Sequence, residues 1–381
     1  MKKIIVSPDS FKGSLSAPEV ANAIEEGIIN VFPDCETIKI PIADGGEGTM
    51  ETLVSALGGE KVKLRVHNPL MQLIEVEYGL VNDGKTAIIE MAIASGLTLL
   101  SDEEQNPLLT TTYGTGEIIK DALKRGCRSF LIGIGGSATN DAGTGMLKAL
   151  GYRFLDLNGK ETDGTGKSLH SICSIDEANV IPELKKAHFI IACDVNNPFS
   201  GSNGAAYVYA PQKCADKQMV LELDEGLENF RKLIEKEKTL NLNNIQGSGA
   251  AGGMGGGFVA FLNAQLKPGI EMVLEAVDFE KHLHNAELVI TGEGKLDKQT
   301  GMGKAASGIL DAANKCDVPV IALGGCVENV ECLNKRGFIS AFSISPSPMS
   351  LEDAMQKDNA RRNIEQTTEQ IMRTIRQFKN A

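Results

Sequence analysis

The chain has 381 residues, which is long for one hydrophobic core, so we expect two α/β domains. Its 42% hydrophobic content argues against disorder, and a formal net charge of −12 argues against a nucleic-acid partner. The eight cysteines are scattered singly, so we expect reduced thiols in a cytoplasmic protein. No apolar stretch approaches the roughly 20 residues that span a bilayer, so we expect no membrane partner.

Five short apolar segments from the two ends of the chain are each followed by a loop and a helix. The predicted strands cover residues 3–7, 37–42, 288–291, 318–323 and 338–344, and the predicted helices cover 17–30, 46–57, 302–315, 327–335 and 351–377. Near-continuous apolar strands that alternate with amphipathic helices indicate a parallel sheet covered on both faces. We expect these strands to lie in the order 2-1-3-4-5, as in a flavodoxin-like domain.

The middle of the chain has a different pattern of predicted strands and loops. Its predicted strands cover residues 61–66, 72–81, 85–91, 129–134, 188–193 and 205–209, with long Gly/Asn/Thr loops between them and a helix-like run at 258–266. We therefore predict two α/β domains. Residues 1–65 and 286–381 would form a discontinuous, five-stranded parallel flavodoxin-like domain, and residues 66–285 would form an inserted mixed α/β domain.

Three polar loops follow strands of the first predicted domain, at residues 7–14, 43–49 and 291–297. Ligands of open parallel sheets bind beyond the carboxyl ends of the strands. Carboxylates beside ammonium groups suit a small anionic substrate and a metal-bound phosphate there. Asp and Gly also serve simple strand-to-helix turns, but three loops at one edge favour a binding site. The candidate residues are Asp9, Ser10, Lys12, Asp44, Glu47, Glu293, Lys295 and Asp297.

Three further loops belong to the predicted insertion. Residues 133–145 follow a strand and open a helix, a geometry that directs amides and the positive helix end at an anion. Residues 247–257 are a second glycine-rich cradle or, alternatively, a flexible linker. In the loop 193–198, Asp194 would bind Mg²⁺ or accept a hydroxyl proton, and an Asx turn before Pro198 is the alternative.

Six motifs in this order along the chain resemble the signatures of the class I glycerate kinases. They are SPDSFKGS at 7–14, ADGGEGT at 43–49, GGSATNDAG at 135–143, CDVNNP at 193–198, the glycine cluster at 247–257 and TGEG at 291–294. The resemblance implies ATP-dependent phosphorylation of D-glycerate, usually at the 2-hydroxyl, with Mg²⁺. It also implies a flavodoxin-like domain with a second α/β domain. A kinase that makes 3-phosphoglycerate or uses a related small hydroxy acid is the alternative.

On this hypothesis each loop receives a role. The expected catalytic residues are Lys12, Asp194 and Lys295, with the lysines on the glycerate carboxylate or the γ-phosphate, and the expected metal ligands are Asp194 and Asp141. The expected substrate-binding residues are Asp9, Ser10, Asp44, Glu47, Glu293 and Asp297. The expected nucleotide-binding residues are Gly135, Gly136, Ser137, Thr139, Asn140, Gly253, Gly255 and Gly256.

Two rival functions fit the sequence less well. A nicotinamide-dependent 2-hydroxy-acid dehydrogenase predicts a GxGxxG motif after the first strand and a histidine base, and the sequence has neither. A non-catalytic ligand-binding regulator would not need so many carboxylates and amides at one edge. Both rivals therefore rank below a kinase.

Overall fold

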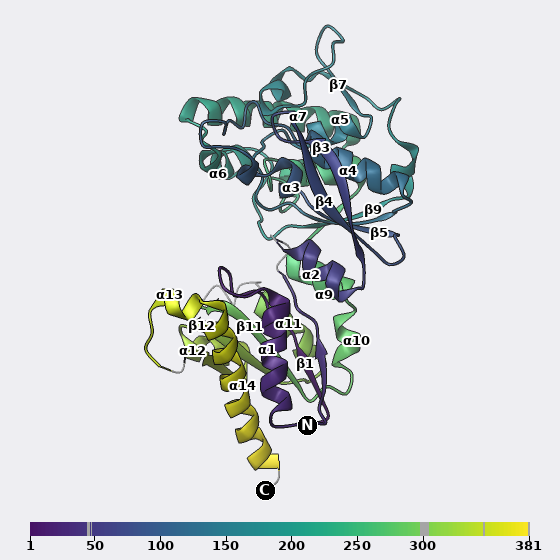
Figure 1. Cartoon of the computed structure of the whole chain (residues 1–381). Coiled ribbons are helices and arrows are strands. Elements are labelled where there is room, and N and C mark those ends of the chain that lie inside the picture. Colours follow the sequence, from purple (N-terminus) through teal and green to yellow (C-terminus); the bar gives the residue numbers. More distant parts are fainter. Residues whose placement is uncertain (44–45, 47, 298–304, 346, 380–381) are drawn as a thin grey trace. The chain divides into compact units, whose positions relative to one another are not determined.

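The computed structural model describes residues 1–43, 46, 48–297, 305–345 and 347–379 (Figure 1). The chain divides into two compact units. The first unit comprises Met1–Asp44 and Val273–Ala381, and the second comprises Gly45–Met272. The divisions predicted from the sequence, after residues 65 and 285, lie 21 and 13 residues further along the chain than these boundaries.

The first unit is built on a five-stranded parallel sheet in the order β13-β12-β11-β1-β2. The predicted order 2-1-3-4-5 is therefore confirmed. The central strands are buried, whereas the two edge strands are partly exposed, as their position requires. The strands are β1 (Lys3–Val6), β2 (Glu36–Lys39), β11 (Leu288–Leu296), β12 (Val320–Val327) and β13 (Ser340–Ser343).

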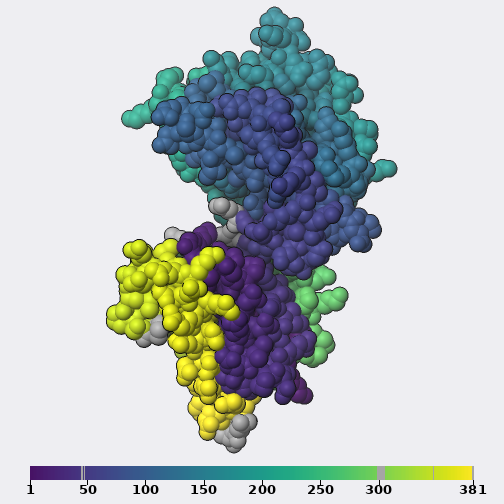
Figure 2. Space-filling view, viewed as in Figure 1, coloured from purple at the N-terminus to yellow at the C-terminus, as the bar shows by residue number. Residues whose placement is uncertain are grey.

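Helices from the two ends of the chain pack together on one face of this sheet. Helix α1 (Ala17–Ile29) starts at Ser16, which forms a capping box with Glu19. It lies against α14 (Lys357–Lys379) over the core formed with β1, β11 and β12, and Figure 2 shows these terminal segments side by side. Helix α11 (Ala305–Lys315) packs on β11 and β12 outside that core. The remaining helices are α10 (Phe279–Leu283), α12 (Val330–Arg336) and α13 (Leu351–Met355), and α9 (Gly269–Ala276) contains the point where the chain passes from the second unit back to the first.

The single helix predicted for residues 351–377 is wrong, because the structure has two helices there. Ser350 caps α13, and Gln356 then adopts an extended conformation (φ −61°, ψ 131°) before α14 begins. No proline or glycine marks this break in the sequence. The break turns α13 away from the axis of α14 and gives the unit a short helix of its own beside the loop that follows β1.

The second unit is built on a six-stranded mixed sheet in the order β10-β9-β6-β5-β4-β3. Strands β10, β9, β6 and β5 are parallel, and β4 and β3 continue the sheet in antiparallel fashion. The strands are β3 (Glu60–His67), β4 (Leu73–Val81), β5 (Thr86–Glu90), β6 (Ser129–Gly133), β9 (His188–Ala192) and β10 (Gln265–Lys267). A separate antiparallel pair joins β7 (Arg153–Leu155) to β8 (Ser174–Asp176).

Most helices of the second unit enclose one large apolar core with this sheet. They are α3 (Ala92–Ser95), α4 (Tyr113–Lys124), α5 (Thr144–Ala149), α6 (Ala205–Tyr209), α7 (Lys217–Lys238) and α8 (Met254–Leu262), whereas α2 (Thr49–Ala56) packs on β4 and β5 outside that core. Short 3₁₀ helices cover Leu97–Leu99, Gly166–Ser171, Pro182–Lys186, Pro211–Lys213 and Leu242–Asn244. None of the helices in the described part of the chain is both long and apolar enough to cross a membrane.

Two predictions for this unit are wrong. The strand predicted at 205–209 is helix α6, in which the amide of Val208 donates to the carbonyl of Gly204 (3.1 Å). Its two alanines are buried, while Tyr207 and Val208 stay exposed, so the aromatic and β-branched residues that suggested a strand do not form a buried one. The helix-like run at 258–266 ends at Leu262, and its last residues form strand β10.

Candidate functional site

The loop after β1 has a fixed backbone. The amide of Asp9 donates to the carbonyl of Gly292 in β11 (2.8 Å). Phe11 and Leu15 then form a short antiparallel bridge, and both side chains are buried. Lys12 lies in the turn between them and is exposed. The loop therefore presents an ammonium group from a backbone that is held at both ends.

Strand β11 runs further than predicted, through Leu296, so Glu293 and Lys295 are strand residues rather than loop residues. Both pair in register with residues of β12. Glycines permit this close pairing: a Cβ added to Gly325 would lie 2.7 Å from the carbonyl oxygen of Gly294. The strand geometry gives the two charged side chains defined directions at the sheet's carboxyl edge.

Lys295 is balanced by carboxylates. Its Nζ lies 3.1 Å from Oε1 of Glu328 and 3.9 Å from Oδ2 of Asp297, and its side chain remains 53% exposed. The hydrogen bond with Glu328 raises the pKa of Lys295 above its ordinary value. The lysine is therefore charged at neutral pH, with two anionic neighbours that an incoming anion would have to displace or share.

The loop after β1 and the end of β11 line a cavity of about 430 Å³ at the carboxyl ends of β1, β11 and β12, here called the strand-end cavity. Such an edge is where open parallel sheets bind ligands. Six predicted site residues line it together: Asp9, Ser10, Lys12, Glu293, Lys295 and Asp297. Asp44 and Glu47, predicted for the same edge, lie outside the described residues.

The sequence pattern gives no signal for the apolar wall of this cavity. That wall comes from elements distant in the chain, with Ile344 after β13, Leu351 and Met355 on α13, and Ala360 on α14. Leu351 is 75% exposed, so this side of the cavity is open to solvent. No local sequence signal connects α13 with the loop after β1, so only the fold shows that they share a cavity.

In the second unit, the loop between β6 and α5 is here called the glycine loop (residues 134–143). Gly135 and Gly136 are exposed at its tip, whereas Ser137, Thr139 and Asn140 are buried. The backbone is held on both sides, because the carbonyl of Gly136 accepts from Leu97 and the amide of Ala138 donates to Ser95 (2.9 Å each). The loop thus combines a rigid frame with an open tip.

Asp141 occupies the positive end of α5 itself. Its carboxylate accepts hydrogen bonds from the amide (2.8 Å) and hydroxyl (2.7 Å) of Thr112 and from the amides of Gly143 (3.1 Å) and Gly145 (3.2 Å). Burial raises the pKa of Asp141, and these four donors oppose that shift. The expectation that this helix end faces a ligand anion is corrected, because a carboxylate of the same loop already fills it.

The glycines at 247–257 are explained by close packing against the glycine loop. A Cβ on Gly252 would lie 2.1 Å from the carbonyl oxygen of Thr139, and one on Gly256 would lie 2.6 Å from the Phe199 ring. Gly253 precedes helix α8, and Gly255 is buried with Gly256 in its first turn. This packing would require glycine even without a nucleotide, so nucleotide contact at 253, 255 and 256 stays a prediction.

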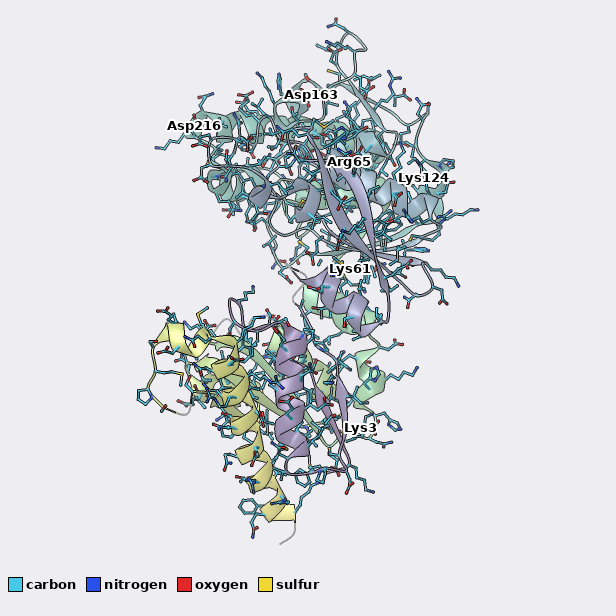
Figure 3. The ribbon with its side chains drawn as sticks, viewed as in Figure 1. Lys3, Lys61, Arg65, Lys124, Asp163 and Asp216 are labelled. Carbon is cyan, nitrogen blue, oxygen red and sulfur yellow. The ribbon has the colours of Figure 1, made fainter. Side chains whose placement is uncertain are left out.

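The structure also reveals a buried cation that the sequence analysis missed. Lys213 is 1% exposed, and its Nζ donates to Oγ of Ser137 (2.7 Å) and to the carbonyl oxygen of Thr139 (2.5 Å). It is the last residue of the 3₁₀ helix Pro211–Lys213, and Asp216, which Figure 3 labels, caps the start of α7 three residues later. In the sequence, a lysine two residues after Pro211 is typical of an exposed turn, so no local pattern distinguishes it.

Candidate metal ligands are sparse. The described residues include no group of three or more His, Cys, Asp or Glu side chains that could hold a metal ion. Asp194 is exposed after β9, and its Oδ1 accepts from the amide of Gly269 (3.0 Å). Asp141 fits a metal poorly, because its carboxylate already accepts four hydrogen bonds. Mg²⁺ in kinases needs only one or two carboxylates beside the substrate phosphates, so Asp194 fits that role better.

Known proteins resemble this chain over nearly its whole length. The glycerate kinase family model matches residues 4–376. A glycerate kinase of Halalkalibacterium halodurans is 46% identical over 361 residues, which cover 94% of this chain and 95% of that protein. The glycerate 2-kinase of Escherichia coli K12 is 44% identical over 355 residues, which cover 93% of each chain.

The structural match is equally complete. The crystal structure of a candidate glycerate kinase 2 from Salmonella typhimurium LT2 matches with a TM-score of 0.92 and 42% sequence identity, and the match covers 100% of both chains. The fold, the order of the motifs and the sequence identity therefore all indicate the same family. The chain belongs to the glycerate kinase family.

Proposed function

We propose that this enzyme transfers the γ-phosphoryl group of ATP to the 2-hydroxyl of D-glycerate, with Mg²⁺ as cofactor. The observation that carries the proposal is the strand-end cavity, which gathers six residues chosen from the sequence for an anionic hydroxy acid. The name of the Escherichia coli relative, glycerate 2-kinase, supports the choice of hydroxyl. We also propose that the first unit is a flavodoxin-like domain carrying the second unit as an insertion, which its strand order supports.

The residues of the strand-end cavity suit phosphoryl transfer, which asks a protein mainly to position reactants and neutralise charge. Lys12 and Lys295 provide positive charge for the glycerate carboxylate or for the transferring group. The carboxylates of Asp9, Glu293 and Asp297 can accept hydrogen bonds from the substrate's hydroxyls. In this arrangement the cations hold the anionic end of the acid, while the carboxylates orient the alcohol that reacts.

The glycine loop is the proposed phosphate site of the nucleotide. Support comes from its exposed tip at Gly135 and Gly136 and from polar atoms deeper in the loop. Among the described residues, the hydroxyl of Thr139 and both polar atoms of the Asn140 side chain are buried without a hydrogen-bond partner. Buried polar groups normally have partners. Mg²⁺, where bound, neutralises phosphate charge, and the exposed carboxylate of Asp194 would help to hold it.

The test is product analysis by ³¹P NMR after incubation of the enzyme with ATP, Mg²⁺ and D-glycerate. We expect the resonance of 2-phosphoglycerate and stoichiometric ADP, and no turnover when EDTA replaces Mg²⁺. Formation of 3-phosphoglycerate alone would refute the proposed regiochemistry. Absence of ADP formation with D-glycerate and with related hydroxy acids would refute the kinase assignment itself.

A further inference from the structure

A buried ammonium group needs an explanation, because removing a charge from water costs free energy that hydrogen bonds only partly restore. Lys213 is 1% exposed and sits behind the glycine loop. Asp141 is the ionisable neighbour whose charge acts on it, but the two side chains form no ion pair within 4.0 Å, and the carboxylate is held by other donors. Stability alone would favour an apolar side chain at this position.

The two hydrogen bonds of Lys213 set the orientation of the glycine loop. Its Nζ donates to the carbonyl oxygen of Thr139, and because a trans peptide places C=O and N–H on opposite sides, the amide of Asn140 points away from the lysine. Its second bond goes to Oγ of Ser137, which must accept it. The Ser137 hydroxyl in turn donates a long hydrogen bond to the carbonyl oxygen of Thr139 (3.5 Å), so both contacts of the lysine belong to one small network inside the loop.

The neighbouring polar atoms point to a ligand. Asn140 is fully buried, yet neither its amide nitrogen nor its carbonyl oxygen has a partner among the described residues, and the same is true of the Thr139 hydroxyl. Three unpartnered polar atoms on consecutive residues beside a buried cation are unusual for a folded core. A bound anion with several oxygens would accept hydrogen bonds from the two donors among them, the Asn140 amide nitrogen and the Thr139 hydroxyl.

We propose that Lys213 is a positioning residue that orients the glycine loop and supplies the fixed positive charge for a polyphosphate bound by residues 135–140. This inference rests on the proposed function, because the polyphosphate is that of the nucleotide. Lys213 acts through Ser137 and Thr139. It therefore affects nucleotide affinity more than the chemical step, and K213M should raise KM for ATP with a smaller change in kcat.

The proposal has a pH signature. Burial lowers the pKa of Lys213 to about 7, and the negative charge of Asp141 opposes that shift. A polyphosphate binds the protonated form, so affinity should fall as pH rises through and above this pKa, by up to about tenfold per pH unit. Ionisation of the nucleotide's own phosphates adds negative charge as pH rises and would strengthen binding to a permanent cation. Deprotonation of Lys213 therefore lowers the affinity as pH rises, whereas ionisation of the phosphates raises it.

The experiment measures MgADP binding by calorimetry between pH 6 and pH 8.5 on four proteins. We expect wild-type affinity to fall as pH rises, and K213M to bind about 10- to 100-fold more weakly than wild type at pH 6.5. K213R keeps its charge at every pH and should bind without the fall. The control is K217M, which removes an exposed lysine four residues away on α7 and should follow wild type.

The outcomes separate this inference from the proposed function. Wild-type affinity that is flat or rises with pH, or K213M that matches K217M, overturns the role of Lys213 even when the enzyme phosphorylates glycerate. The wild-type pH profile needs no variant, so a K213M protein that fails to fold does not block the test. No MgADP binding to wild type at any pH would overturn the nucleotide proposal together with this inference.

Discussion

The two units present their lysines in opposite ways. In the strand-end cavity, Lys12 and Lys295 are exposed, and Lys295 shares its charge with carboxylates on the same rim. Behind the glycine loop, Lys213 is buried and is held by a hydroxyl and a carbonyl. Exposed cations can move to follow charge during a reaction, whereas a buried cation keeps one position. The first arrangement suits a reacting group, and the second suits a permanent binding site.

The carboxylates of the two units differ in the same way. Asp9, Glu293 and Asp297 line a cavity, where they can exchange partners with a ligand. Asp141 is buried and accepts four hydrogen bonds from its own unit. Similar residue types in similar glycine-rich motifs therefore line an open cavity in one place and hold the backbone of a loop in the other. Mutations in the two units should separate these roles.

The largest expected effect belongs to Asp141. Replacing it with alanine leaves four donors without an acceptor in a buried site, so the free energy of unfolding should fall by about 3–5 kcal/mol. Chemical denaturation monitored by circular dichroism measures this. Asp102→Ala, at an exposed position, is the control and should change stability by less than about 0.5 kcal/mol. A stable Asp141→Ala protein with lost Mg²⁺ dependence would instead make Asp141 a metal ligand.

The next largest effect is on catalysis by Lys12. Its ammonium group has no hydrogen-bond or ion-pair partner among the described residues, so Lys12→Ala should leave stability unchanged. If Lys12 stabilises charge on the transferring group, kcat should fall by about 10²–10³. Steady-state kinetics with D-glycerate and ATP measures the change, with Lys335→Ala on α12 as the exposed control. A rise in KM alone would place Lys12 on the glycerate carboxylate, and wild-type constants would remove it from the site.

The smallest effects concern two glycines that sequence reasoning treated alike. In Gly256→Ala the new methyl group would meet the Phe199 ring at 2.6 Å, so the free energy of unfolding should fall by about 1–3 kcal/mol. In Gly135→Ala the methyl group meets no atom within 4 Å, so stability should change by less than about 0.5 kcal/mol while KM for ATP rises. Equal destabilisation by both substitutions would contradict the distinction between packing and binding glycines.

Local patterns in the sequence were sufficient for much of the fold. The five strands of the first unit, their order and the start of α1 at Ser16 all follow from apolar runs, capping residues and the rules of parallel sheets. Six residues at one sheet edge could likewise be chosen because carboxyl ends of parallel strands meet there. These features follow from the local order of apolar and capping residues and from the rule that the carboxyl ends of parallel strands meet at one edge of the sheet.

Other features depended on contacts between distant segments. Residues 205–209 form helix α6, whose two alanines are buried, and residues 351–377 are split between two helices at the extended Gln356. The apolar wall of the strand-end cavity joins α13 and α14 to the loop after β1, across most of the chain.

For the candidate sites, the sequence by itself determined which residue types follow each strand, and hence the family and the charged edge of the first unit. Only the tertiary structure decided the state of each charge. No local sequence pattern distinguishes Lys213 and Asp141 from exposed charged residues, yet both are buried by segments far from them in the chain. Burial removes water, and the loss of water changes a charged group's pKa and its need for partners. The burial of these two side chains arises only when distant segments pack together, so it could not be predicted from the local sequence.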